Sequence, residues 1–400
     1  MNPRPDSDSD SAHPRLALVH DFLIQMGGAE RVVEEMAKAF PDAPILTSAT
    51  FGDNLFPEFR SPRVHNSWMQ HLPGMRKLHK KLFFLYPFAF KSLKIERADV
   101  AWISSSSFSK WIPKPLGTKF VCYCHTPPRF FWNPDEYLRN EIGNPLLRRF
   151  VRALMPLFRW SDRRQSRKID FFIANSRNVQ QRIRDCYGRD SAVIYPPVDV
   201  ERFQVSESSD DYFLIVSRLV AYKRIDLAVR AFTAAGRKLV VIGDGPDRAR
   251  LEAMAGPTVT FLGLAPDEVV TEKMAHCRGF VFPGSEDFGI TPVEAQACGK
   301  PVIAFREGGA LETVIDGETG VFFDQPTPES LAGAIEAFDR VAWNRAIIRR
   351  NAERFSVTRF IDETRRLLDR VENGATSATI KPGQVSDQTL LPPESHPARP

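Results

Sequence analysis

Apolar residues along the chain fall into short runs and longer periodic segments that alternate with one another. Runs such as residues 15–20 and 279–282 are almost wholly apolar, as expected of strands that are buried on both faces. After the first run, apolar residues recur with the helical period, at Ala29, Val32, Val33, Met36, Ala37 and Phe40. Strands alternating with helices predict parallel sheets with right-handed crossovers, so the pattern indicates the α/β class.

The alternation is interrupted once, near Pro196 and Pro197, and restarts with a strand at residues 212–219. A chain of 400 residues also exceeds what one hydrophobic core usually serves, so two domains are expected. The predicted organisation is a disordered tail at 1–14, a first domain at 15–195, a linker at 196–210, a second domain at 211–357, a helix at 358–372 that returns to the first domain, and a disordered tail at 373–400.

The composition is that of a soluble globular protein, with 43% hydrophobic and 26% charged residues. The first residues lack the basic flank and apolar core of a signal peptide, and no apolar run approaches the roughly 18 residues of a membrane span. The formal charge of +5 gives little support to nucleic-acid binding. The five cysteines fit no ligand spacing, so we expect buried, reduced thiols and a cytoplasmic protein.

The segment at 279–294 carries the strongest chemical signal. A strand leads through a loop with Glu286 to Thr291-Pro292-Val293-Glu294, which has the composition of a helix start with Thr291 as the N-cap and Glu294 at the third helical position. The backbone amides from Ile290 onward would then face a site suited to an anion such as a diphosphate. From the residues alone, Glu294 could equally complete a capping box, and Glu286 could be a solvated loop acid.

Three other places could contribute to a site at the carboxyl ends of strands. Gly27 and Gly28 lie between the first strand and its helix, where a tight turn is the ordinary explanation. His125 follows the strand at 119–124, although a single histidine there is more often structural. Arg218 and Lys223 lie in the loop after the strand at 212–219, where solvation is the default.

The string EDFGITPVEAQACGKPVIA, at residues 286–304, resembles the donor-site signature of the retaining glycosyltransferases of family 4. The segments GGAERVV, CHTPPRFFW and YKRIDLA support the same resemblance. It implies the GT-B fold, in which two Rossmann-like domains have parallel sheets that face a central cleft. The resemblance covers roughly residues 15–371.

The resemblance also implies roles for the candidate residues. Glu286 would lie by the transferred sugar, Glu294 would hold the nucleotide ribose, and His125 would contact the sugar near the reaction centre. The donor diphosphate would be bound by Gly27, Gly28, Arg218, Lys223 and the helix start at Gly289, Ile290 and Thr291. Tyr222 and Arg224 surround Lys223 where many family members have Lys-Gly, so the resemblance does not fix the path of Lys223.

The order of the motifs is most similar to the bacterial mannosyltransferase-like subgroup that builds O-antigen or other cell-surface polysaccharide. The resemblance implies a retaining hexosyl transfer from a nucleotide-sugar, with GDP-mannose as the first expectation and a UDP-sugar as the other, and with no cofactor or metal. Two alternatives remain open at this point, a GT-B sugar-nucleotide epimerase and a catalytically dead scaffold that binds a sugar nucleotide.

Residues 66–95 contain no acid but combine basic residues with aromatic ones, and a second basic block follows at 146–168. The first stretch holds Arg76, Lys77, Lys80, Lys81, Lys91, Lys94, Phe83, Phe84, Tyr86, Phe88 and Phe90. Such a pattern suits an anionic membrane surface, although a packed helix with a solvated face would look similar. We therefore expect peripheral contact with the inner face of the cytoplasmic membrane, where a lipid-linked glycan acceptor would be reached.

Overall fold

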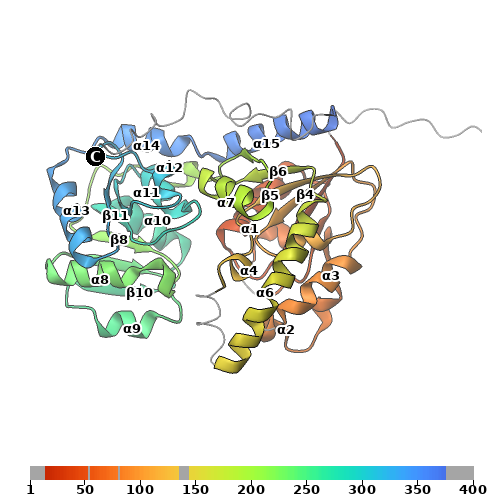
Figure 1. Cartoon of the computed structure of the whole chain (residues 1–400). Helices are drawn as coiled ribbons and strands as arrows, with labels where there is room; N and C mark the ends of the chain where they lie inside the picture. The colour runs from red at the N-terminus through yellow and green to blue at the C-terminus, as the bar shows by residue number, and fades with distance from the viewer. Residues whose placement is uncertain (1–13, 53–54, 80–81, 135–143, 375–400) are drawn as a thin grey trace, which may run out of the picture. The chain divides into compact units, whose positions relative to one another are not determined.

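The computed structural model describes residues 14–52, 55–79, 82–134 and 144–374 (Figure 1). Contacts within the chain divide it into two compact units. Of the described residues, the first unit holds those up to 175, 179–194 and 361–374, and the second holds 176–178 and 195–360. Each unit is an α/β layer structure with its own sheet and core, as the alternating pattern predicted.

The described part of the first unit contains a parallel sheet of seven strands in the order β3-β2-β1-β4-β5-β6-β7. Its strands are β1 (Leu16–His20), β2 (Ile45–Thr47), β3 (Val64–Asn66), β4 (Val100–Ser105), β5 (Lys119–Cys124), β6 (Phe171–Ala174) and β7 (Ala192–Val193). The central strands are buried throughout because helices cover both faces, which explains their continuous apolar runs. The order of the strands reverses between β1 and β4, where ligands bind in open sheets of this kind.

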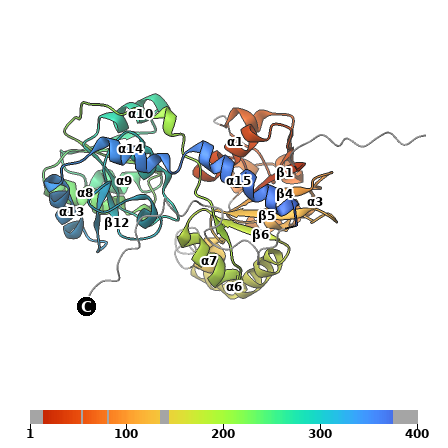
Figure 2. The same cartoon turned by 90° about the horizontal axis from the view of Figure 1, so that it is seen from above.

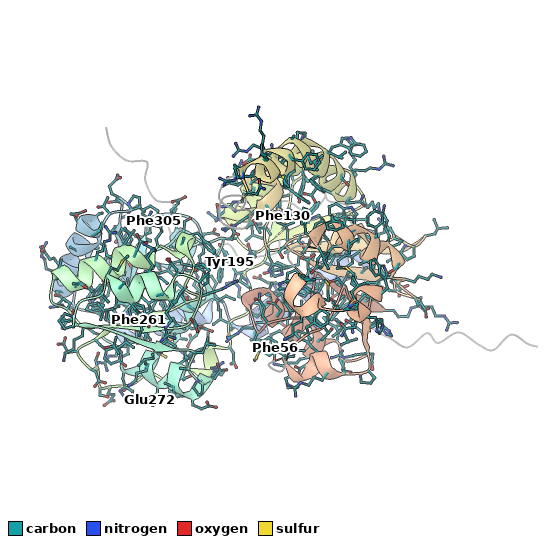
Figure 3. All side chains as sticks on the ribbon, turned by 90° about the horizontal axis from the view of Figure 1, so that it is seen from below. Phe56, Phe130, Tyr195, Phe261, Glu272 and Phe305 are labelled. Atoms are coloured by element: carbon teal, nitrogen blue, oxygen red, sulfur yellow. The ribbon has the colours of Figure 1, made fainter. Side chains whose placement is uncertain are left out.

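The helices of the first unit include one long amphipathic helix and several shorter ones. They are α1 (Gly28–Ala39), α2 (Met75–Leu78), α3 (Tyr86–Ser92), α4 (Arg129–Trp132), α6 (Pro145–Ser166), most of α7 (Arg177–Tyr187) and most of α15 (Val357–Glu372). Phe130, from α4, packs among aromatic rings of this core, 4.3 Å from Phe131 and 6.3 Å from Phe83 between ring centroids (Figure 3). The aromatic residues of the basic stretch therefore contribute to the core as well as to the surface.

A buried ion pair anchors α6 beneath the loop that follows β4. Lys110 Nζ lies 3.4 Å from Asp162 Oδ1, and both side chains are fully buried. The other carboxylate oxygen of Asp162 accepts hydrogen bonds from Trp132 Nε1 and the Tyr187 hydroxyl, at 2.9 and 2.7 Å. Burial alone would lower the Lys110 pKa, but Asp162 together with Cys122, Cys124 and Asp21 outweighs burial and raises the pKa. Because each charge is compensated, the pair holds the helix in one register against the sheet.

The second unit has a parallel sheet of six strands in the order β10-β9-β8-β11-β12-β13, of which Figure 2 labels β12. They are β8 (Phe213–Val216), β9 (Leu239–Ile242), β10 (Val259–Gly263), β11 (Gly279–Phe282), β12 (Val302–Phe305) and β13 (Gly320–Phe323). The covering helices are α8 (Ile225–Ala234), α9 (Arg248–Ala253), α10 (Asp267–His276), α11 (Ile290–Ala297), α12 (Ala310–Thr313), α13 (Pro328–Arg340) and α14 (Arg345–Glu353). Its strand order reverses between β8 and β11, which again marks the ligand-binding edge.

Several sequence predictions agree with these elements to within one residue. The strands expected at 119–124 and 279–282 are β5 and β11, and the last helix, expected at 358–372, is α15. From residue 361 onward α15 belongs to the first unit, where the guanidinium of Arg365 lies 5.7 Å from the centre of the Phe40 ring. The two expected tails fall almost wholly outside the described residues. No helix in the described part of the chain is long and apolar enough to cross a membrane.

Candidate functional site

Two loops at the ligand-binding edge of the second unit bring opposite charges together. The loop after β8 carries Lys223, and the loop after β11 carries Glu286. The Lys223 ammonium forms an ion pair with the Glu286 carboxylate, and both side chains are mostly buried. Residues that are 63 positions apart in the sequence are thus adjacent because β8 and β11 are neighbours in the sheet.

Glycines hold the Glu286 loop in place by allowing backbones to touch. A side chain at Gly284 would have its Cβ 2.7 Å from the carbonyl oxygen of Lys223, and one at Gly308 would have it 2.3 Å from that of Glu286. Gly309 N–H donates to the same Glu286 oxygen at 2.9 Å. Any larger residue would force these loops apart, so the glycines fix the position of Glu286. These glycines were not among the predicted site residues. Two adjacent glycines shortly after a buried strand are nevertheless a sequence signal for close contact between backbones.

The helix after Glu286 begins differently from the prediction. Thr291 was expected as the N-cap, but α11 begins at Ile290 and its N-cap is Gly289, which has φ 85° and ψ 90° and makes no side-chain capping bond. The prediction of the cap was wrong because Gly289, as a glycine, can adopt this backbone and start the helix two residues earlier. Pro292 then falls in the first turn, where its missing N–H has no intrahelical partner to lose.

This earlier start moves Glu294 out of the capping position. It becomes the fifth helical residue and is only 5% exposed, too far along for the capping box that was considered for it. Ile290 and Thr291 remain in the first turn of α11, so their amides still face the end of the helix where an anion is favoured.

Arg218 and Lys223 differ in their surroundings. The Arg218 side chain is exposed, and within the described residues it makes no hydrogen bond or ion pair, whereas Lys223 is held by Glu286. Arg224, which replaces the glycine of the family pattern, adopts the left-handed conformation with φ 51° and ψ 34°. That is a conformation that glycine would take without strain.

In the first unit, three polar side chains meet at the carboxyl ends of neighbouring strands. Ser104 Oγ lies 2.9 Å from His20 Nδ1 and 2.7 Å from His125 Nε2. His20 is the last residue of β1, Ser104 is the penultimate residue of β4, and His125 directly follows β5. These three strands are adjacent in the sheet. His125 was a sequence candidate, whereas His20 and Ser104 were not, because only the order of the strands places them beside it.

Protonation of this cluster is constrained. Burial lowers the pKa of His20 to about 4, and burial together with the neighbouring His20 lowers that of His125 to about 3, although part of His125 remains exposed. Both rings are therefore neutral at pH 7. Since the Ser104 hydroxyl has one proton, it donates to one ring and accepts from the other. The remaining ring nitrogens, His20 Nε2 and His125 Nδ1, must then be one donor and one acceptor.

The buried carboxylate of Asp21 orders the serine-rich loop that follows β4. It accepts hydrogen bonds from the backbone amides of Ser106, Ser107 and Ser109 at 2.6, 2.8 and 2.7 Å, and from the Ser106 hydroxyl at 3.0 Å. Burial alone would raise the Asp21 pKa, but His20 and these amides outweigh it and lower the pKa. Asp21 thus stays ionised and fixes the loop beside Ser104.

The Gly27-Gly28 turn is shaped by Glu30 at the third position of α1. Gly27 is the N-cap, and a Cβ there would lie 2.6 Å from Glu30 Oε2, which explains why the position is a glycine. Glu30 is 2% exposed, and its Oε2 has no hydrogen-bond partner in the described structure. Burial raises its pKa to about 7 against the opposing effect of nearby groups, chiefly the Glu30 and Gly27 amides and Gln25. A carboxyl that changes charge near neutral pH therefore adjoins the candidate diphosphate loop.

The basic stretch of the first unit forms an exposed face of mixed character. Phe84 and Phe88 are 50% and 60% exposed, while Phe83 is partly buried, 5.8 Å from Phe158 of α6 between ring centroids. Tyr86 and Phe90 are buried, so only part of the aromatic set is at the surface. Lys80 and Lys81 lie outside the described residues.

Helix α6 continues this face with an exposed apolar stripe, which we define as Leu146, Phe150, Ala153, Leu157 and Trp160. These residues follow each other at spacings of four, three, four and three, so they line one side of the helix. Exposed Arg149, Arg152, Arg163 and Arg164 flank the stripe. An apolar stripe of this length at the surface is unusual for a helix whose other side already packs on the core.

The described residues contain no group of three or more His, Cys, Asp or Glu side chains placed to hold a metal ion. The positive charge that balances a bound anion would instead come from Arg218, Lys223 and the first turn of α11. That transfer needs no metal stays a prediction.

Two family models match the chain in succession. The model described as Glycosyltransferase Family 4 matches residues 26–202, and the model described as Glycosyl transferases group 1 matches residues 198–354. Together they span residues 26–354, which is most of the chain.

Curated relatives with similar sequences are glycosyltransferases by name, and several of them are mannosyltransferases. The GDP-mannose-dependent alpha-(1-6)-phosphatidylinositol monomannoside mannosyltransferase of Mycolicibacterium smegmatis is 30% identical over 215 residues, covering 46% of this chain and 56% of that protein. Human alpha-1,3/1,6-mannosyltransferase ALG2 is 26% identical over 260 residues, covering 56% and 59%. These alignments span little more than half of the relatives' length, whereas that with mouse ALG2, at 25% identity, covers 88% of this chain and 94% of that protein.

Solved structures with a similar fold include glycosyltransferases with low sequence identity. HepE of Anabaena in complex with UDP and glucose superposes with a TM-score of 0.66 at 20% identity, covering 89% of this chain and 100% of that chain. Sucrose-phosphate synthase of Thermosynechococcus elongatus has a TM-score of 0.67 at 17% identity, covering 90% and 100%. The shared fold is GT-B, the architecture expected from the sequence.

Proposed function

The chain belongs to glycosyltransferase family 4, and from this premise we propose that it transfers a mannosyl group from GDP-mannose to a lipid-linked or other glycan acceptor. The transfer would retain the configuration at the anomeric carbon and serve cell-surface polysaccharide biosynthesis. The observation that carries the proposal is the ion pair of Lys223 with Glu286 beside Arg218, at the edge where the strand order reverses.

The charges at this edge match those that glycosyl transfer develops. As the bond to the anomeric carbon breaks, the sugar becomes positive and the departing diphosphate becomes negative. Arg218, Lys223 and the first turn of α11 would stabilise the diphosphate, because fixed positive groups favour the charge that appears in the transition state. Arg218 makes no bond within the described residues that a phosphate would have to displace.

The two glutamates would act on different parts of the donor. Glu286 is fixed by glycine contacts and by Lys223, so it can orient sugar hydroxyls with little loss of side-chain entropy. Glu294, in the helix that begins at this edge, would hold the ribose. Binding of the phosphates by Lys223 would loosen its pairing with Glu286 and leave that carboxylate available for the sugar.

His125 would contact the sugar as a neutral group. Its lowered pKa favours a hydrogen bond over proton exchange at pH 7. The His20-Ser104 arrangement would fix which nitrogen carries the proton, and Gly27 and Gly28 at the start of α1 would approach the diphosphate.

The identity of the donor rests on the names of the relatives. Mannosyltransferases among them favour GDP-mannose as the first candidate. HepE was solved with UDP and glucose, so a UDP-sugar is the second candidate to test.

We also propose that the protein works in the cytoplasm, at the inner face of the cytoplasmic membrane. Support comes from the exposed stripe of α6, its flanking arginines, and exposed Phe84 and Phe88. Apolar side chains could enter the headgroup region while the basic residues meet anionic lipid. Such contact would bring a lipid-linked acceptor to the enzyme.

One assay separates the proposal from the epimerase and scaffold alternatives. The full chain is incubated with GDP-mannose, UDP-glucose or UDP-N-acetylglucosamine and a bacterial membrane extract, while nucleotide release and label transfer to lipid are followed. Acceptor-dependent release of GDP with labelled lipid supports the proposal. Epimerisation of the donor in the absence of acceptor would indicate the epimerase. Tight binding of the nucleotide-sugar without turnover would indicate the scaffold.

A further inference from the structure

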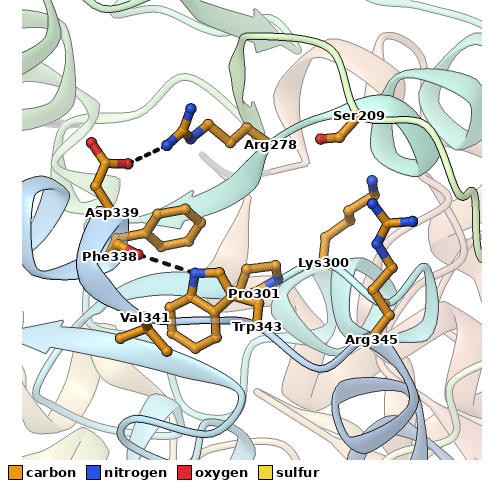
Figure 4. Close-up of a pocket in the computed structure, with 10 residues that line it drawn as sticks. Ser209, Arg278, Lys300, Pro301, Phe338, Asp339, Val341, Trp343 and Arg345 are labelled. Atoms are coloured by element: carbon orange, nitrogen blue, oxygen red, sulfur yellow. Dashed lines mark hydrogen bonds and ion pairs between the residues drawn. The ribbon is translucent and has the colours of Figure 1, made fainter.

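A cavity of about 250 Å³ opens at the opposite edge of the second sheet from the candidate donor site (Figure 4). Arg278 directly precedes β11 and Pro301 directly precedes β12, so the cavity lies where these strands begin. Glu286, by contrast, follows the end of β11. Nothing in the proposed transfer reaction uses this cavity.

Two cations meet in its wall without a counter-ion. Lys300 is only 2% exposed, and its Nζ donates to the Ser208 carbonyl at a long 3.4 Å. Arg345 Nη1 donates to the carbonyls of Ser206 and Glu207 at 2.9 and 2.5 Å. Figure 4 shows the charged ends of Lys300 and Arg345 close to one another on the same side of the cavity. Among the described residues, neither has a carboxylate within 4.0 Å.

The acid that does line the cavity is already neutralised. Asp339 forms ion pairs with Arg278 and Arg237, each at 2.6 Å. Asp210 acts on Lys300 only from beyond ion-pair distance. Burial lowers the pKa of Lys300, and the charge of Arg345 acts in the same direction against the opposing effects of Cys277, Cys298 and Asp210. Buried charges are normally paired, so an anion bound next to these two cations would be stabilised by them.

The other side of the cavity is apolar. Phe338 and Trp343 pack with ring centroids 5.1 Å apart, and Pro301 lies beside them. The indole N–H of Trp343 donates to the Phe338 carbonyl at 3.1 Å, so the polar atom of this ring is satisfied and ring carbons form the wall. A ligand that fills the cavity would therefore need a charged end and a small apolar body.

We propose that this cavity binds a small organic oxyanion, with a carboxylate or phosphate between Lys300 and Arg345 and a flat apolar group against Trp343, Phe338 and Pro301. The site is separate from the donor site and does not depend on the proposed transfer activity. Its ligand supplies the counter-charge that the cluster lacks.

The test is a site-resolved titration. The full chain is labelled with 5-fluorotryptophan, and the Trp343 signal is identified by its absence in Trp343→Phe. Phenyl phosphate and benzoate are then added separately, with benzyl alcohol as the uncharged probe. The Trp343 fluorine signal should shift saturably with at least one anion and stay unchanged with benzyl alcohol. Comparison of the two anions decides between phosphate and carboxylate.

Three variants make the result specific. Lys300→Met should weaken binding about tenfold or more, because it removes a charged hydrogen-bond donor. Lys238→Met removes an exposed lysine before β9, at the same sheet edge, and should bind like the wild type. The double variant Arg218→Ala, Lys223→Ala should also keep the Trp343 response, which excludes an effect transmitted from the donor site.

Thermal unfolding without ligand distinguishes a binding role from a structural one. Lys300→Met should be at least as stable as the wild type, since the charge that it removes has no counter-ion. If neither anion shifts the Trp343 signal, or if the shift survives both Lys300→Met and Arg345→Gln, the proposal is overturned. A lower melting temperature of Lys300→Met combined with an unresponsive wild type would instead show that Lys300 only ties down the 206–208 backbone.

Discussion

Ser104 Oγ lies 2.7 Å from His125 Nε2 and 2.9 Å from His20 Nδ1, so one hydroxyl links the histidines at the ends of two strands. The hydroxyl proton can be given to only one ring at a time. The tautomer of His125 therefore depends on that of His20, and Ser104 positions His125 without itself needing to contact the sugar.

The first prediction concerns this link. Ser104→Ala should change the tautomer balance of His125, which is measured by the imidazole ¹⁵N shifts, and should lower kcat about tenfold. The free energy of unfolding in urea should stay within about 1.5 kcal/mol of the wild type, which is the value of one neutral hydrogen bond. Ser191→Ala is the matched control, because Ser191 is a buried serine whose hydroxyl has no partner in the described structure. Unchanged ¹⁵N shifts in Ser104→Ala would show that the link does not set the tautomer.

The second prediction is a pH dependence from Glu30. Its folded pKa, about 7, is above its ordinary value of 4.5, so the stability that it contributes is fully present below about pH 4.5 and is lost as the pH rises to about 7. The difference corresponds to roughly 3 kcal/mol. Glu30→Gln imitates the protonated carboxyl and should gain stability over the wild type between pH 5 and pH 8 in urea unfolding. If the difference in unfolding free energy between Glu30→Gln and the wild type is the same at pH 5 and at pH 8, the prediction is contradicted.

The third prediction concerns the α6 stripe. Phe150→Ser with Trp160→Ser should abolish cosedimentation with liposomes at any salt concentration, because it removes the apolar contact. Arg149→Ser with Arg152→Ser should instead weaken binding to anionic liposomes alone, by about 1 kcal/mol per charge, and the loss should shrink in high salt. Ile347→Ser, an exposed apolar residue of the second unit, is the control. If the wild-type protein does not cosediment with anionic liposomes at low salt, the proposed membrane contact is contradicted.

The fourth prediction is that transfer survives excess EDTA. Arg218, Lys223 and the first turn of α11 would meet the leaving diphosphate without a metal. Turnover by the dialysed protein is measured with EDTA and after addition of Mg²⁺ or Mn²⁺. Activity that disappears with EDTA and returns with either ion would show that a metal takes part.

The sequence predicted the strands well because their signal is local. Residues 120–124 and 279–282 are uninterrupted apolar runs, and burial in a covered parallel sheet requires no more than that. The start of α11 was misplaced by two residues, since Thr-Pro-x-Glu is a good local cap but Gly289 can adopt a backbone that no other residue takes readily. Here a single dihedral angle outweighed the capping preference.

The candidate residues that belong to a sequence motif were predicted. Those that become neighbours only in the folded structure were missed. Glu286 and Lys223 could be proposed from the resemblance, but their ion pair follows from the neighbouring positions of β8 and β11. The contacts of His20 and Ser104 with His125 likewise depend on the order β1-β4-β5. Local pattern does not contain strand order, which explains why these partners were not predicted.

The most direct test of the account is the turnover of GDP-[¹⁴C]mannose with a bacterial membrane extract, comparing the wild type with Glu286→Gln. The wild type should transfer label to lipid, and Glu286→Gln should lose roughly a hundredfold or more in turnover while keeping the wild-type melting temperature, because the change removes one charge from a preorganised loop. Asp324→Asn, an exposed acid after β13, should behave like the wild type. Near-normal transfer by Glu286→Gln would contradict the assignment of this edge as the donor site, and no transfer by the wild type from GDP-mannose or a UDP-sugar would contradict the proposed function.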